Sequence, residues 1–103
     1  MLVDDLKVLL ASQFSLYIKA ANFHWNIEGT NFPQYHDFFG DFYVEVSEPI
    51  DRIAEYIRIL DSYTPASLSK FTELSVISDQ NGTKMAVGMF MELQSVNDMQ
   101  KQI

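Results

Sequence analysis

The chain has 103 residues, of which 48% are hydrophobic, and it carries 7 basic against 14 acidic side chains, for a formal net charge of −7. Its length predicts a single domain over residues 1–103, and its hydrophobic content is too high for a disordered protein. The absence of cysteine excludes disulfides, cysteine-ligated zinc and iron–sulfur clusters. The acidic balance disfavours binding to nucleic acid or anionic membranes and is compatible with cations.

The first residues do not have the pattern of a secretory signal. Asp4 and Asp5 precede Lys7, whereas a signal peptide begins with basic residues. No apolar run approaches the roughly 18 residues that a membrane span requires. We therefore expect a cytoplasmic protein that makes no membrane contact.

Apolar residues recur every three or four positions over the first 25 residues, which is typical of an amphipathic helix. They include Leu2, Leu6, Leu9, Phe14, Tyr17, Ala21 and Trp25. Gly29 favours a helix stop and Pro33 a helix start. The short connection predicts that this helix and the next run antiparallel as neighbours.

A second helical pattern spans residues 33–60 and contains Pro49. Because the periodicity keeps its phase across the proline, we expect a kink and not a break. Pro65 and Ser67 are suited to open a short helix over residues 68–74, and a third long helix is expected over 83–103. Strand-like alternation and internal repeats are absent, so the predicted fold class is all-α, a helical bundle built on a long hairpin.

Four side chains have the chemistry of metal ligands. His24 lies near the end of the first predicted helix and His36 in the first turn of the second, so the hairpin brings both to one end of the bundle. Asp51 and Glu55 are four residues apart and share one helix face. Imidazole and carboxylate ligands suit iron, manganese or zinc.

The two pairs of ligands cannot meet within one chain. Positions 36 and 51 are about 22 Å apart along a helix. A shared metal site would therefore require two copies of the chain, arranged as antiparallel hairpins across a two-fold axis.

Each of these side chains also has a simpler interpretation. His24 could be a hydrogen-bonded histidine of the core or of a helix end, and His36 could be a surface residue in the first turn of its helix. The two carboxylates lie beside Arg52 and Arg58, and exposed acids in such a setting usually form intrahelical ion pairs.

The segment 19–32, KAANFHWNIEGTNF, followed by His36, resembles the Dps family of mini-ferritins. The segment 50–58, IDRIAEYIR, is similar to the second signature of that family. The resemblance extends from about Val3 to the end of the chain and weakens after Leu60.

This resemblance implies a ferritin-like bundle that assembles from two-fold dimers into a dodecameric shell, oxidises Fe(II) with peroxide or oxygen and stores the ferric product. It implies that His24 and His36 of one chain, with Asp51 and Glu55 of its partner, are the metal-binding and catalytic residues. Trp25 would lie near this site.

The sequence departs from the family pattern at several points. Gly40 stands where the family has a carboxylate, so we expect a ferroxidase weakened at its second iron position. A lysine-rich N-terminal tail is missing, so DNA binding is not expected. Family members have a fourth helix, which this chain does not reach. A partial reading, a shortened member and a remodelled assembly all stay open. The alternative function is a non-catalytic ferritin-like scaffold, or a DNA-protecting assembly protein, with a degenerate metal site.

Overall fold

The structure is a computed structural model that describes residues 2–28 and 32–77. Within them the chain forms α1 (Leu2–Asn26), α2 (Phe32–Ile59) and α3 (Leu68–Leu74), which confirms the all-α prediction. The helix expected over residues 83–103 lies outside the described residues. Although α1 and α2 have the length for a membrane span, neither contains a sufficiently apolar stretch, so no candidate span is found in the described part of the chain.

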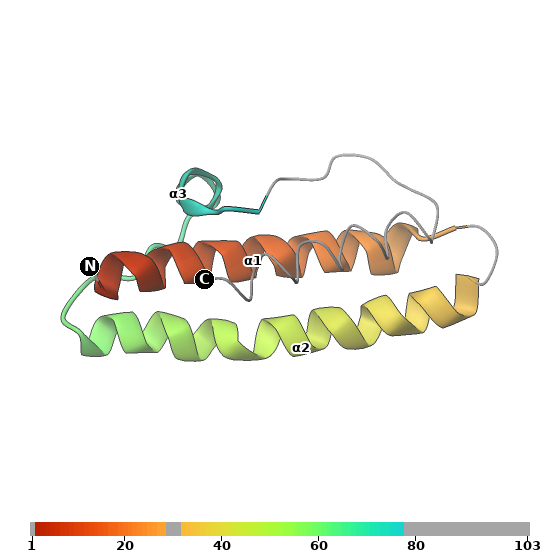
Figure 1. The fold of residues 1–103 in the computed structure, drawn as a ribbon, viewed down its shortest axis with the longest axis horizontal. Helices are drawn as coiled ribbons and strands as arrows, with labels where there is room; N and C mark the ends of the chain where they lie inside the picture. Colours follow the sequence, from red (N-terminus) through yellow and green to blue (C-terminus); the bar gives the residue numbers. More distant parts are fainter. Residues whose placement is uncertain (1, 29–31, 78–103) are drawn as a thin grey trace.

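Helices α1 and α2 form an antiparallel hairpin (Figure 1). Apolar side chains spaced three or four residues apart face each other along it, as the periodicity predicts. Phe23 of α1 and Phe39 of α2 are fully buried, with ring centroids 5.6 Å apart. Burying a side chain of this size stabilises the fold by about 1.5–3 kcal/mol. The main buried cluster consists of Leu16, Ala20, Phe23, Ile27, Phe39, Val46 and Ile77.

Helix α2 continues through Pro49, so the prediction that the proline does not break it is confirmed. A proline removes one backbone donor and loosens the preceding turn. In that turn the side-chain amide of Gln13, from α1, donates a 2.9 Å hydrogen bond to the carbonyl of Val46. Pro49 deprives the carbonyl of Glu45, not that of Val46, of its helical donor, so this bond links α1 to α2 beside the interruption without replacing the missing donor.

The C-terminus of α2 is closed by a left-handed residue. Asp61 has φ 64°, and its N–H donates to the carbonyl of Arg58 while the N–H of Ser62 donates to that of Ile57. This pair of bonds is a Schellman motif, in which the left-handed position is usually a glycine. The helix therefore ends at Ile59, one residue before the predicted boundary.

The short helix α3 has the predicted bounds, Leu68–Leu74. Ser67 is its N-cap, and its hydroxyl accepts from the N–H of Lys70. The helix packs on α1, where the rings of Phe71 and Phe14 have centroids 4.8 Å apart. This contact holds the connection after α2 against the outer side of the hairpin (Figure 1).

Candidate metal centre

The two histidines lie together where the hairpin turns, as the sequence predicts. Their imidazole rings stack with centroids 4.0 Å apart and an interplanar angle of 20°. The Nδ1 atom of His24 is 2.7 Å from the carbonyl oxygen of His36, and the Nδ1 atom of His36 is 2.8 Å from the carbonyl oxygen of His24. Each ring is therefore fixed to the backbone of the other helix.

These two hydrogen bonds determine the tautomer of both rings. A carbonyl oxygen can only accept, so each Nδ1 carries a proton and donates it. In the neutral imidazole the lone pair is then on Nε2. Metal-binding histidines commonly donate their other ring N–H to a backbone carbonyl, which orients the ring and makes it a better ligand. Each ring is thus oriented by its Nδ1 hydrogen bond, and its Nε2 atom is of the type that can bind a metal ion.

The surroundings of the pair are half-buried and aromatic. Tyr43 approaches His24 with ring centroids 5.3 Å apart. On α2, Gly40 lies beneath His24, so that a Cβ atom placed on it would be 2.8 Å from Cε1 of that ring. Trp25, the next residue along α1, is 69% exposed.

Sequence reasoning did not identify Tyr43 or the contact at Gly40. Tyr43 lies seven residues after His36, which is two helical turns, so the spacing was a usable signal for a shared face. The contact at Gly40 had no such signal, because it depends on how the two helices are rotated against each other.

Asp51 and Glu55 lie on an exposed face of α2. A hydrogen bond with Asp51, together with repulsion by its charge, raises the pKa of Glu55. Two acids held this close share a proton more readily than isolated ones and offer a cation two carboxylate groups. The guanidinium of Arg58 is engaged elsewhere, since it donates to the carbonyl of Ser62 and lies 4.8 Å from the centroid of the Tyr63 ring.

The structure does not bring the histidines and the carboxylates together in one chain. Among the described residues, no group of three or more histidine, aspartate or glutamate side chains could hold a metal ion. The separation of about 22 Å along α2 accounts for this. The assignment of these four residues to one site between two copies stays a prediction.

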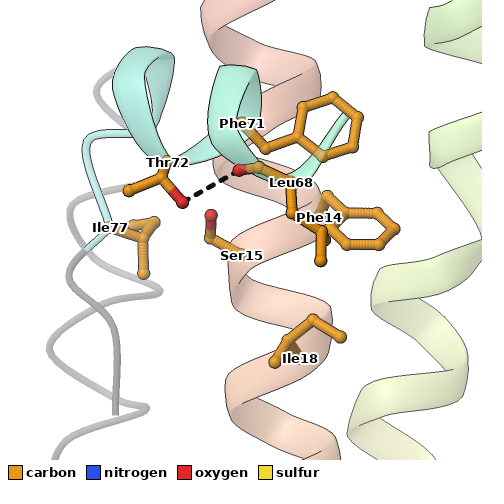
Figure 2. A pocket seen from close by; sticks show the side chains of 7 residues that line it. All are labelled: Phe14, Ser15, Ile18, Leu68, Phe71, Thr72 and Ile77. Atoms are coloured by element: carbon orange, nitrogen blue, oxygen red, sulfur yellow. Dashed lines mark hydrogen bonds between the residues drawn. The ribbon is translucent and has the colours of Figure 1, made fainter. Parts of the chain in front are cut away.

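A separate hollow of about 330 Å³ lies between α1 and α3 (Figure 2). Two hydroxyl groups line the hollow, and each donates a hydrogen bond within its own helix. Ser15 donates to the carbonyl of Ala11, and Thr72 donates to the carbonyl of Leu68. The remaining lining side chains are apolar, and none of the described lining residues is titratable: Phe14, Ile18, Leu68, Phe71 and Ile77. The hollow is therefore lined mainly by apolar side chains, and none of these residues offers a reactive group.

Residues 3–101 match the sequence model of the ferritin-like domain. Antigen TpF1 of Treponema pallidum is 34% identical over 82% of this chain and 48% of its own length. A DNA protection during starvation protein of Brevibacillus brevis is 35% identical over 86% of this chain and 58% of its own length. The chain thus spans about half the length of these curated relatives.

Solved structures show the same arrangement of helices. The crystal structure of antigen TpF1 matches with a TM-score of 0.88 and 31% identity, over 94% of this chain and 63% of that one. A Dps protein from Vibrio cholerae O1 matches with a TM-score of 0.90 and 25% identity, over 96% and 62%. That protein is described as a member of a broad superfamily of ferritin-like diiron-carboxylate proteins.

Proposed function

Because the chain belongs to the ferritin-like domain family and its relatives include Dps proteins, we propose that it is a subunit that binds Fe(II), oxidises it and stores the product. The observation that carries this proposal is the reciprocal hydrogen bonding of His24 and His36. It orients two imidazoles as metal ligands before any metal arrives, which favours metal binding over a merely structural role.

The complete site would form between two copies of the chain. His24 and His36 of one copy would supply nitrogen ligands, and Asp51 and Glu55 of the other would supply oxygen ligands and compensate the positive charge. Two observations support this arrangement: the pairs are too far apart to meet in one chain, and the carboxylate pair is exposed and so accessible to a neighbour. The smallest active unit would be a two-fold dimer.

Iron would be the substrate of the reaction. With hydrogen peroxide as oxidant, two Fe(II) ions each lose one electron, and one peroxide takes two electrons and two protons to give two water molecules. The residues of the chain would bind and orient the metal, because mixed imidazole and carboxylate ligands suit Fe(II). Asp51 raises the pKa of Glu55, and a cation bound beside the pair would act in the opposite direction by favouring the ionised carboxylate.

Anaerobic Fe(II) titration, followed by peroxide addition, tests the proposal. Wild-type protein should bind Fe(II) saturably and oxidise it, whereas the His24→Ala and Glu55→Gln variants should lose saturable binding. Glu45→Gln is the matched control, because Glu45 is another exposed acid of α2. Wild-type protein that bound no more iron than Glu55→Gln would refute the ferroxidase function and leave a non-catalytic scaffold.

Protection of DNA by tight binding is not favoured. One relative is named for DNA protection during starvation, but the net charge of −7 on this chain would be multiplied in any assembly. Such a surface repels phosphates. A gel-shift assay at low salt should show no complex with duplex DNA.

A further inference from the structure

Gly40 lies one turn after His36 on α2, directly against the His24 ring. A Cβ atom built on Gly40 would be 2.8 Å from Cε1 and 3.0 Å from Nδ1 of that ring. Carbon atoms in ordinary contact are about 3.5–4.0 Å apart. A side chain at position 40 and the observed position of His24 therefore exclude each other.

His24 cannot move away without losing interactions. Its Nδ1–H donates to the carbonyl of His36 at 2.7 Å, and its ring stacks on the His36 ring. Tyr43 lies 5.3 Å from it, centroid to centroid. A ring displaced by a new Cβ would have to lengthen that hydrogen bond or slide off the stack.

We propose that Gly40 is a positioning residue, whose missing side chain allows the His24 and His36 rings to be held as a pair with both Nδ1 protons on backbone carbonyls. The inference rests on the proposed function, since it assigns a purpose to the ligand pair. It means that this chain does not tolerate a carboxylate at position 40 beside the paired rings.

The proposal also defines the ligand that the site takes. Without a ligand from position 40, the proposed inter-subunit site holds one borderline divalent cation, such as Fe²⁺, Co²⁺ or Zn²⁺, on two nitrogen donors and the partner's carboxylates. Mg²⁺ binds poorly, because it requires near-octahedral oxygen ligands. Gly40→Asp would then bind the first cation more weakly and not gain a second.

The test compares wild-type protein with Gly40→Ala, Gly40→Asp and the control Asp41→Ala, which changes the next, exposed residue of α2. Titration with Co²⁺ should show one ion per subunit in wild type and Asp41→Ala. Both Gly40 variants should bind Co²⁺ about 10–100-fold more weakly, the usual effect of disturbing a ligand's orienting partner. A second Co²⁺ in Gly40→Asp, with the first unweakened, would overturn the proposal, as would unchanged binding in Gly40→Ala.

A second measurement does not depend on metal binding. In ¹⁵N-histidine spectra of metal-free protein, wild type should show two Nδ1-protonated rings, and Gly40→Ala should lose this pattern for His24.

Gly40→Ala should also lower the unfolding midpoint when His24 is present and raise it in a His24→Ala background, where alanine only improves helix propensity. Equal effects in both backgrounds would refute the contact. Wild-type protein that binds no Co²⁺ yet shows these effects would refute the proposed function alone.

Discussion

His24 and His36 each donate an Nδ1 proton to the backbone carbonyl of the other, at 2.7 and 2.8 Å. The carbonyl of His24 lies in the last turn of α1, where helical carbonyls lack an intrahelical partner, and the His36 ring supplies a donor to it. The two proposed metal ligands are thus also a structural link between the two helices.

This double role predicts that the histidines contribute to stability without metal. His24→Ala and His36→Ala should each lower the free energy of unfolding by about 1 kcal/mol, the usual net value of a hydrogen bond. Because each ring stacks on the other, the double variant should lose less than the sum of the single variants. Urea denaturation in the presence of a chelator measures all three. Strict additivity would show that the rings do not interact.

The proposed site between two copies can be tested by mixing inactive chains. One variant carries His24→Ala and His36→Ala, and the other carries Asp51→Asn and Glu55→Gln. A mixed dimer then contains one site with all four native ligands and one site with none. Random reassociation should therefore restore about one quarter of the wild-type Fe(II) sites. No recovery in verified mixed dimers would exclude a site shared across the two-fold axis.

The hairpin and the short helix could be predicted because their signals are local. The apolar periodicity of α1 and α2 requires only the 3.6-residue repeat, and Ser67 provided a recognisable N-cap for α3. The proximity of His24 and His36 followed from antiparallel packing. Their mutual hydrogen bonds did not, because these depend on the rotation of each helix about its axis.

The end of α2 shows a different limit. The residue that closes this helix is Asp61, whereas the recognised signal for a left-handed stop is glycine. The exact boundary was therefore missed by one residue. Whether Asp51 and Glu55 meet the histidines of another copy depends on assembly, which a single chain does not contain.

The carboxylate pair should oppose folding of the metal-free protein. Since Asp51 raises the pKa of Glu55 in the folded state, the native chain holds a proton more tightly than the unfolded chain and becomes less stable as the pH rises through that pKa. Asp51→Asn should thus raise the thermal midpoint at neutral pH, and its advantage over wild type should shrink in acid. Glu45→Gln should show no such pH-dependent difference, and an advantage of Asp51→Asn that persisted in acid would contradict the explanation.

Asp61 provides a test of backbone strain independent of the proposed metal site. With φ 64°, it occupies the left-handed region, which costs a residue with a side chain roughly 1 kcal/mol relative to glycine. Asp61→Gly should therefore raise the free energy of unfolding by up to about 1 kcal/mol. Asp61→Ala is the control, because it removes the same carboxylate but keeps the Cβ atom. If alanine stabilised the chain as much as glycine in urea denaturation, the gain would come from removing a negative charge at the C-terminus of α2 and not from relief of strain.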